Sequence, residues 1–181
     1  MKKKIIITGG LGYIGTELCK LYSGVSWNNE IIVIDKRFVS ERVNQIRNWN
    51  MEFVHGDILD KKLINNHCKD ADIVHHLAGI TDVPRTVSES NEDKDKEIKL
   101  VAEEGTKNIL EAISSKCKII FPSTHVVYEG IEKVKNNISE EDDLKPLLSY
   151  SSSKAINEKQ LKNSGKNYII LRLGSVYGYS S

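Results

Sequence analysis

The chain has 181 residues, of which 39% are hydrophobic, a length and apolar content that fit one domain with its own core. Its 26 Lys and Arg nearly balance its 25 Asp and Glu, so composition gives no reason to expect binding to nucleic acid or to an anionic membrane surface. No apolar run approaches the roughly 18 residues of a membrane-spanning helix, and the N-terminal lysines precede only three isoleucines, too short a run for a signal peptide.

Short apolar runs alternate with longer stretches of helical composition along the chain. Strands are predicted at residues 4–8, 31–35, 52–55, 73–77, 118–122 and 168–172. Helices are predicted at residues 13–22, 41–47, 59–67, 95–114 and 151–163. Apolar, β-branched strands that alternate with helices indicate a parallel sheet buried on both faces. With right-handed crossovers, this order predicts an α/β fold of the Rossmann type, a doubly wound parallel sheet of about six strands with helices on both faces.

The first predicted strand runs directly into Gly9, Gly12 and Gly15, which have the spacing G-x-x-G-x-x-G and open a helix. In a dinucleotide site the first glycine permits a tight turn, the second lets the backbone approach pyrophosphate, and the third allows close packing of helix on strand. The helix N-terminus adds free N–H groups and a partial positive charge for the anion. The glycines alone would also fit an ordinary turn between a strand and a helix.

Asp35 strengthens the dinucleotide interpretation because it ends the second predicted strand, twenty residues after Gly15. An acid at that distance can bond both hydroxyls of the adenosine ribose. An acid also repels a 2′-phosphate, so NAD is favoured over NADP as the cofactor. Lys36 and Arg37 follow directly and weaken this preference, unless they are solvated loop charges. The predicted cofactor contacts in this part of the chain are Gly9, Gly12, Tyr13, Ile14, Gly15, Asp35 and Lys36.

Tyr150 is followed four residues later by Lys154, in the sequence Tyr-Ser-Ser-Ser-Lys. On a helix, positions i and i+4 share one face. A lysine ammonium beside the positive nicotinamide of the cofactor would favour the phenolate and lower the tyrosine pKa from about 10. Such a tyrosine can take the proton of an alcohol that gives up hydride. Without the glycines, the pair would fit a surface tyrosine near a solvated lysine.

The histidines and cysteines do not predict a metal site. His75 and His76 are adjacent on a predicted strand, so their side chains point to opposite faces, and a packing role is favoured. Cys19, Cys68 and Cys117 are far apart and have no metal-binding or disulfide spacing. They are predicted to be buried thiols or incidental surface residues, which fits a cytoplasmic location.

With these motifs, the chain resembles the extended short-chain dehydrogenase/reductases, and within them the NAD-dependent epimerase/dehydratase family that acts on nucleotide sugars. The resemblance covers nearly the whole chain. It rests on residues 8–15, 56–60, 76–79, 105–110, 123–128 and 176–178, and on Glu140, Pro146, Tyr150, Lys154, Glu158 and Arg172 in the family's order.

The resemblance implies further cofactor contacts. Asp57 and Ile58, after the third predicted strand, would hold the adenine. The remaining residues lie at the ends of the fourth and fifth predicted strands and line the cofactor; they are Leu77, Ala78, Gly79 and Ser123.

The resemblance also implies the catalytic residues. Tyr150 would be the general base and would also contact the cofactor, and Lys154 would bond the nicotinamide ribose and tune Tyr150. Thr124 takes the place of the family's catalytic Ser or Thr and would hydrogen-bond the reacting oxygen.

The activity implied is that of an NAD-dependent nucleotide-sugar epimerase. Hydride would leave a sugar carbon for NAD, the keto intermediate would rotate, and hydride would return to its other face. Two other interpretations stay open, a reductase or dehydrogenase of the same family and a non-catalytic NAD-binding module. The resemblance further implies a homodimer that forms through the predicted helices 95–114 and 151–163.

The chain departs from the family pattern at several positions. The family usually has asparagine where Ala102 and Ser175 stand. It usually has Val-Tyr-Gly after the fifth strand, but here Glu129 separates Tyr128 from the following glycine. Sugar-nucleotide 4,6-dehydratases carry an Asp-Glu pair directly after the catalytic Thr. His125 and Val126 stand there instead, which argues against a dehydratase of that kind.

The family also has a C-terminal portion that holds the nucleotide sugar. Residues 1–181 are therefore expected to form an NAD-binding Rossmann domain that includes Tyr150 and Lys154, with most of the substrate domain absent. Binding of the substrate's remote nucleotide normally helps to orient the reacting centre. We therefore expect this chain alone to turn over slowly or not at all.

Overall fold

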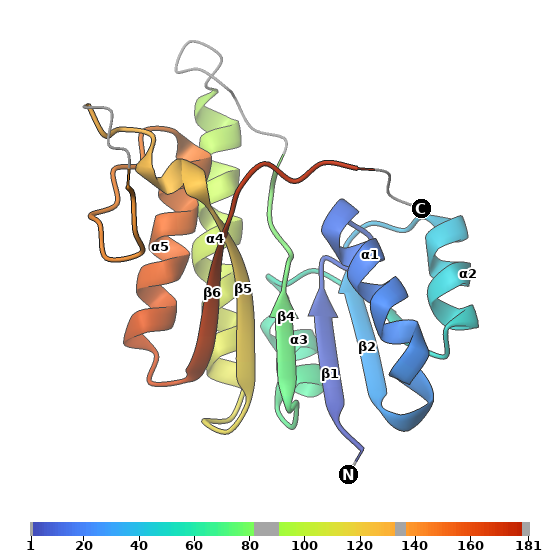
Figure 1. Ribbon diagram of the computed structural model, residues 1–181. Coiled ribbons are helices and arrows are strands. Elements are labelled where there is room, and N and C mark those ends of the chain that lie inside the picture. Colours follow the sequence, from blue (N-terminus) through green and yellow to red (C-terminus); the bar gives the residue numbers. More distant parts are fainter. Residues whose placement is uncertain (1, 82–90, 133–136, 179–181) are drawn as a thin grey trace.

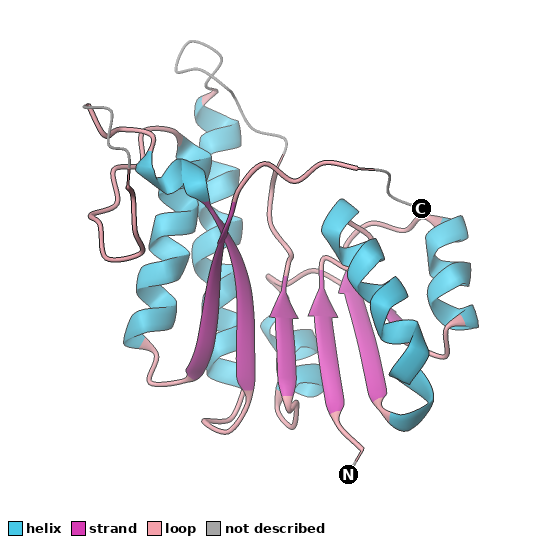
Figure 2. Ribbon diagram, viewed as in Figure 1, coloured by secondary structure: helices cyan, strands magenta, loops and turns pink. Residues whose placement is uncertain are grey.

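The structure is a computed structural model that describes residues 2–81, 91–132 and 137–178. Its strands are β1 (Lys4–Thr8), β2 (Glu30–Asp35), β3 (Glu52–His55), β4 (Ile73–His76), β5 (Lys118–Thr124) and β6 (Asn167–Leu173). They form one six-stranded sheet in the order β3-β2-β1-β4-β5-β6, and every pair is parallel (Figure 2). The chain starts in the middle, winds out to β3, and returns to build β4 to β6 on the other side of β1. This confirms the predicted doubly wound parallel sheet.

Helices cover both faces of the sheet (Figure 1). The α-helices are α1 (Tyr13–Tyr22), α2 (Ser40–Asn48), α3 (Lys61–Cys68), α4 (Glu92–Ala112) and α5 (Ser149–Asn163). Two short 3₁₀ helices, η1 (Ser23–Asn28) and η3 (His125–Tyr128), were not predicted from the sequence. α1 and α2 pack on one face of the sheet, and α3, α4 and α5 pack on the other.

Side-chain caps explain why two helices start at other residues than predicted. Asn91 accepts hydrogen bonds from the backbone N–H groups of Asp93 and Lys94, so α4 begins at Glu92. Asp60 accepts from the N–H of Leu63 at 2.9 Å, so α3 begins one residue after it. Ser, Thr, Asp and Asn are the usual N-caps because their short side chains reach these free donors.

Two further boundaries matter for the candidate site. β5 continues two residues beyond the predicted end, so Ser123 and Thr124 lie on the strand itself. α5 begins two residues before the predicted start, which places Tyr150 within its first turn. The predicted catalytic residues therefore lie on regular secondary structure, Thr124 on β5 and Tyr150 and Lys154 on α5.

Alternation along the strands builds two hydrophobic cores. In β1, Ile6 points to the core shared with α3, α4 and α5, while Ile5 and Ile7 point to the core shared with α1 and α2. All three side chains are at most 3% exposed. Full burial of one such side chain is worth about 1.5–3 kcal/mol, so the centre of the sheet is the best-supported part of the fold.

The β6 edge of the sheet is covered on one face only. Ile170 packs against the core of α3, α4 and α5, and Arg172 pairs with α5. Ile169 and Leu171 point to the opposite face and are 39% and 43% exposed. Among the described residues no helix covers β5 and β6 on that face, which is the face that α1 and α2 cover farther along the sheet (Figure 1).

All three cysteines are buried free thiols. This confirms the first predicted alternative, buried thiols, over incidental surface residues. Burial raises the pKa of Cys19 and of Cys68 to about 12, which suppresses the reactive thiolate. None of the described helices combines the length and the apolar character that crossing a membrane requires.

Candidate functional site

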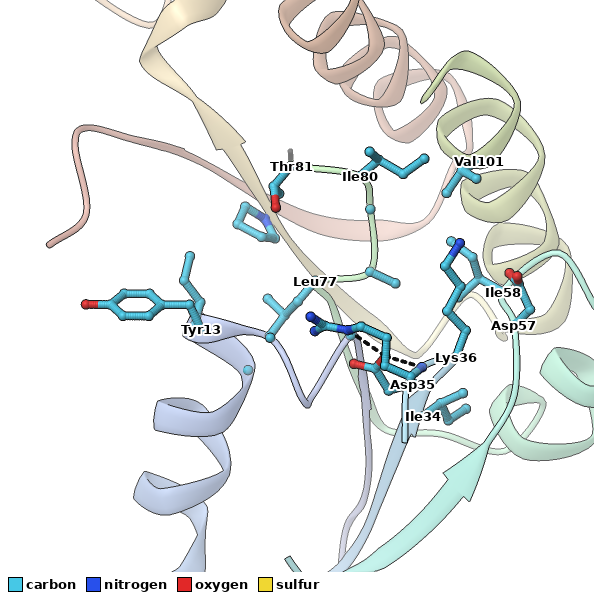
Figure 3. A pocket seen from close by; sticks show the side chains of 18 of the residues that line it. Tyr13, Ile34, Asp35, Lys36, Asp57, Ile58, Leu77, Ile80, Thr81 and Val101 are labelled. Carbon is cyan, nitrogen blue, oxygen red and sulfur yellow. Dashed lines mark hydrogen bonds and ion pairs between the residues drawn. The ribbon is translucent and has the colours of Figure 1, made fainter. Parts of the chain in front are cut away.

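A cleft of about 700 Å³ lies at the carboxyl ends of the strands, where the strand order reverses between β1 and β4 (Figure 3). Doubly wound sheets hold their ligands at this point, because the loops on the two sides diverge there. All predicted cofactor contacts except Ser123 and Tyr150 line it. These residues are Gly9, Gly12, Tyr13, Ile14, Gly15, Asp35, Lys36, Asp57, Ile58, Leu77, Ala78, Gly79 and Lys154.

The glycine turn at the end of β1 needs its glycines for close approach. Gly9 has a φ of +71°, and a Cβ there would lie 2.6 Å from the backbone N of Ala78. A Cβ at Gly15 would collide with the carbonyl oxygen of Gly9. Gly9 thus makes the tight turn and Gly15 brings α1 close to it, as predicted.

Asp35 is fixed in the wall of the cleft by backbone donors. Its Oδ2 accepts from the N–H of Leu11 at 2.9 Å, and its Oδ1 accepts from the N–H of Arg37 at 2.9 Å. The Arg37 Nε lies 3.5 Å from Oδ1, and dashed lines mark contacts of this kind in Figure 3. Each carboxylate oxygen has further lone pairs, so Asp35 can still accept hydrogen bonds from a ribose.

Three cationic side chains, Lys36, Arg37 and Arg42, line the cleft beside Asp35. The Lys36 and Arg37 side chains are 50% and 56% exposed, so they are solvated and border the cleft at the same time. Arg42 lies on α2 and donates a hydrogen bond to the carbonyl of Leu11, at the glycine turn. Nothing in the sequence pattern singled out Arg42, because this contact joins residues that only the fold brings together.

Other lining residues also escaped prediction. Val176 lies in a stretch that the resemblance used, and Ile80 and Thr81 continue the predicted stretch after β4, so their sequence neighbours gave a signal. The lining residues that were not predicted are Ile34, Arg37, Arg42, Gly56, Ile80, Thr81, Val101, Pro122 and Val176.

The loop after β3 is held against the cleft by α4. A Cβ at Gly105 would collide with the Ile58 side chain, so the helix can approach only because a glycine stands there. Asn108, one turn later on α4, donates from Nδ2 to the carbonyl of Ile58 at 3.0 Å. Asp57 accepts from the N–H of Leu59 at 3.0 Å. Ile58 and Asp57 are therefore presented by a fixed loop.

The chain after β6 returns along the cleft toward α1. Val176 lines the cleft, and the hydroxyl of Tyr13 donates to the carbonyl of Gly178 at 2.6 Å. In Figure 1 this segment runs from the end of β6 across to the neighbourhood of α1.

Lys154 brings α5 into the cleft. Its Nζ donates to the carbonyl of Pro122 at 3.0 Å, and it lies 5.7 Å from the ring centroid of Tyr150. Burial lowers the pKa of Lys154 to about 8, so it stays mostly protonated at pH 7. Burial raises the pKa of Tyr150. The pKa lowering predicted for this tyrosine depended on the nicotinamide charge as well as on Lys154, and the chain's own residues leave a neutral phenol.

Thr124 and Tyr150 lie beside the cleft rather than in its lining. Thr124 ends β5, is 8% exposed, and accepts from the N–H of Val126 at 3.3 Å. Tyr150 is half-buried on the neighbouring helix α5, which packs against β5 and η3. The fold thus brings the elements of Thr124, Tyr150 and Lys154 together at one end of the sheet.

The Ser123 side chain is turned to a buried ion pair beneath α5. Its Oγ donates to Glu158 Oε1 at 2.6 Å, while Arg172 donates from Nη2 and Nε to the same carboxylate at 2.7 and 3.0 Å. Burial acts to raise the pKa of Glu158, but the hydrogen bonds from Arg172 and Ser123 outweigh it and hold this pKa below its usual value. The cluster ties β5, β6 and α5 to one another.

The two adjacent histidines pack on opposite faces of β4. His76 is 1% exposed, with Nδ1 3.0 Å from Thr8 Oγ1 and Nε2 3.0 Å from Thr106 Oγ1. Burial and the nearby charge of Lys154 lower its pKa to about 3, so it is neutral. His75 Nε2 lies 2.8 Å from the Tyr22 hydroxyl. In the part of the chain that the structure describes, no group of three or more His, Cys, Asp or Glu could hold a metal ion.

The model of the NAD dependent epimerase/dehydratase family matches residues 5–181. A dTDP-D-glucose 4,6-dehydratase of Dictyostelium discoideum is 32% identical over 97% of this chain and 44% of its own length. A CDP-paratose 2-epimerase of Salmonella typhi is 36% identical over 76% of this chain and 41% of its own length.

Solved structures agree with the fold. The Bordetella bronchiseptica enzyme WbmH, in complex with NAD⁺, matches with a TM-score of 0.80 and 26% identity, over 97% of this chain and 57% of that one. The chain therefore spans about half the length of the relatives it matches.

Proposed function

The chain belongs to the NAD-dependent epimerase/dehydratase family, and from this premise we propose that residues 1–181 form the NAD-binding domain of a nucleotide-sugar epimerase. NAD is the family's cofactor. The observation that carries the proposal is the single cleft that unites the glycine turn, the fixed carboxylate of Asp35 and the ammonium of Lys154. The glycine turn and the acid are suited to binding a cofactor. A buried lysine next to a tyrosine is suited to proton transfer from a hydroxyl group.

Different residues of the cleft would bind different parts of the cofactor. The backbone of residues 9–15 would hold the pyrophosphate, and Asp35 would accept hydrogen bonds from the adenosine ribose. Asp57 and Ile58 would hold the adenine, and residues 77–79 would line the remainder of the cofactor. Ser123 lies outside the lining of the cleft and would border the cofactor at the end of β5. When bound, NAD supplies a hydride acceptor.

Three residues act on the sugar hydroxyl. Tyr150 takes the hydroxyl proton onto its phenolate oxygen, and Thr124 hydrogen-bonds the same sugar oxygen. Lys154 bonds the nicotinamide ribose and places a positive charge by the phenol ring. Because burial alone raises the pKa of Tyr150, a further positive charge is needed to make this tyrosine a base near neutral pH.

Residues next to Thr124 favour epimerisation over dehydration. Elimination of water needs an acid and a base near the sugar, and Val126 can be neither. His125 is exposed, and its Nδ1 lies 3.1 Å from the carbonyl of Leu173. The intact set of Thr124, Tyr150 and Lys154 also argues against a purely structural NAD-binding module, which has no use for a tuned phenol.

The proposal includes a nucleotide-sugar substrate, a cytoplasmic location and pairing of two copies through α4 and α5. These helices lie side by side and are joined by a hydrogen bond from Gln160 Nε2 to the carbonyl of Glu103 at 2.9 Å. A rigid two-helix surface of this kind suits symmetric pairing with a second copy.

Calorimetric titration of the chain with NAD, and with NADP in parallel, tests the proposed site. We expect binding of NAD and much weaker binding of NADP. The variant Asp35→Ala should weaken NAD binding by about tenfold, since one charged acceptor at a ribose is lost. Glu52→Ala, an exposed acid at the start of β3, is the control and should bind NAD like the unchanged chain. Failure of the unchanged chain to bind NAD would contradict the proposal.

A further inference from the structure

The N-cap residue of α5 makes no side-chain hydrogen bond to the helix. Leu148 stands at the N-cap position, and its side chain has no oxygen to accept hydrogen bonds. The first turn of the helix also contains no acidic residue. Helix N-termini leave backbone N–H groups without backbone partners in the helix. Ser151 reaches back to the N–H of Leu148 at 3.2 Å, and a partner from outside the helix can hold this end further.

Glu129 supplies that partner from outside the helix. Its Oε1 accepts from the backbone N–H groups of Leu147 and Leu148, both at 2.8 Å, and from the hydroxyl of Ser151. The Ser151 Oγ in turn lies 3.2 Å from the N of Leu148. A carboxylate at this place also interacts favourably with the positive end of the helix dipole. One oxygen of one side chain thus holds residues on both sides of Tyr150.

The other end of this link is fixed to β5. Glu129 directly follows η3, which begins at the residue after Thr124. The N–H of Lys145 donates to the carbonyl of Val127 at 2.8 Å, and the N–H of Gly130 donates to the carbonyl of Lys145 at 2.7 Å. Residues 127–130 are therefore fastened along the segment that leads into α5.

We infer that Glu129 is a positioning residue that sets Tyr150 on α5 in register with Thr124 at the end of β5. The inference rests on the roles proposed above for Thr124 and Tyr150. Both residues must meet one sugar oxygen, but they belong to different elements, and Glu129 bridges those elements. A displacement of about 1 Å at a reacting centre can cost about 100-fold in rate, so a link of this kind matters even though Glu129 itself does not line the cleft.

Glu129 is also the residue that departs from the Val-Tyr-Gly pattern after the fifth strand. Burial acts to raise the pKa of its carboxyl, but hydrogen bonds from Ser151, Leu148 and Leu147 outweigh burial and lower this pKa. The charged form that best accepts three hydrogen bonds is therefore the form present near neutral pH.

The test uses the 181-residue chain and two variants that separate reach from charge. Glu129→Asp keeps the charge but is one methylene shorter, so it cannot reach the donors at Leu147, Leu148 and Ser151 together. Glu129→Gln keeps the reach but loses the charge. Glu132→Gln, an exposed glutamate three residues later, is the control.

The readout is the titration of the Tyr150 phenol, followed by NMR on ¹³C-labelled tyrosine rings and assigned with Tyr150→Phe. We expect Glu129→Asp to move the titration midpoint by about half a pH unit or more, and Glu129→Gln to move it less. Amide hydrogen exchange at Leu147 and Leu148 should accelerate about fivefold in Glu129→Asp, the ratio expected for a lost helix cap.

A larger shift in Glu129→Gln than in Glu129→Asp would mean that only the charge of Glu129 acts on Tyr150, and it would overturn the inference. Unchanged titration in both variants would overturn it as well, since Glu129 would then serve only the fold. Neither outcome depends on turnover or on NAD. Failure of the proposed function would instead appear as absent NAD binding by the unchanged chain.

Discussion

The middle of the sheet and its β6 edge are supported differently. Around β1 and β2, helices cover both faces, and every apolar strand residue is at most 3% exposed. At β6 only one face is covered, and Ile169 and Leu171 remain partly open to solvent. The first region carries the glycine turn and Asp35. The second pairs with β5, which ends at Thr124, and borders the helix of Tyr150 and Lys154.

This difference separates cofactor binding from catalysis. The groups proposed to hold the adenosine half of a dinucleotide are fixed by packing on two sides and by backbone hydrogen bonds, as at Asp35. The proposed catalytic groups depend instead on a few polar links, chiefly Glu158 with Arg172 and Glu129 with Ser151. We therefore expect binding to survive changes that abolish chemistry.

The largest expected effect is on turnover. Tyr150→Phe removes the proposed proton acceptor and should lower kcat by about 10²–10⁴-fold in any form of the protein that turns over. Its affinity for NAD, measured by calorimetry, should stay within about twofold, because Tyr150 does not line the cleft. Tyr177→Phe, a highly exposed tyrosine, is the control. A normal kcat in the Tyr150→Phe protein would contradict the proposed catalytic role of Tyr150.

The isolated 181-residue chain is expected to convert nucleotide sugars slowly or not at all. Binding energy from a substrate's nucleotide is used to orient the reacting carbon, and the described residues beside Thr124 leave one face of β5 and β6 uncovered. Robust turnover by this chain alone, assayed with UDP-, GDP-, dTDP- and CDP-sugars, would contradict this expectation.

The next largest effect concerns the ion pair of Glu158 and Arg172, which joins α5 to the β6 edge of the sheet. Glu158→Gln leaves the Arg172 guanidinium without its charged partner, and it should lower the free energy of unfolding by about 3–5 kcal/mol, measured by denaturant titration. Glu104→Gln breaks an exposed pair with Lys107 and should cost at most about 0.5 kcal/mol.

The same pair predicts a pH dependence. Because the folded pKa of Glu158 lies below its usual value, its stabilisation is fully present above the unfolded pKa of about 4.3. It is lost as pH falls through the folded pKa. The stability difference between the unchanged chain and Glu158→Gln should therefore shrink below pH 4, and a difference that grows in acid would contradict the assignment.

The smallest effect compares equivalent strand positions directly. Ile7→Ala, in the buried β1 and in register with Ile169 across the sheet, should destabilise by about 2–5 kcal/mol. Ile169→Ala, on the open face of β6, should cost about 1 kcal/mol or less, since much of its side chain already contacts water. Equal losses in thermal or denaturant unfolding would mean that the open face is covered in solution.

The sheet and the glycine turn were predictable because their signals are local. Apolar runs mark β1 and β2, and the spacing of Gly9 and Gly15 meets a steric need that the structure bears out. Asp35 was predicted from its distance to the glycines, which is also a local signal. The contact of Lys154 with the cofactor was implied by the resemblance instead.

The contacts that hold the site could not be predicted in this way. Arg42 reaches the glycine turn from α2, and Glu129 caps a helix that begins twenty residues later, so both depend on how distant segments meet. The start of α5 was predicted two residues too late for the same reason, because Leu148 at the N-cap position gives no sequence signal for the start of a helix. The direction of the Tyr150 pKa depends on burial, which the pattern of Tyr and Lys does not report.

The hydrogen bond from Tyr13 to Gly178 has a kinetic consequence. It joins the first helix to the last described residues, and Val176 between them borders the cleft. A dinucleotide seated beneath this segment could enter and leave only while the bond is open. Both rates should therefore rise together in Tyr13→Phe, so the residence time of the cofactor should shorten more than its equilibrium affinity changes.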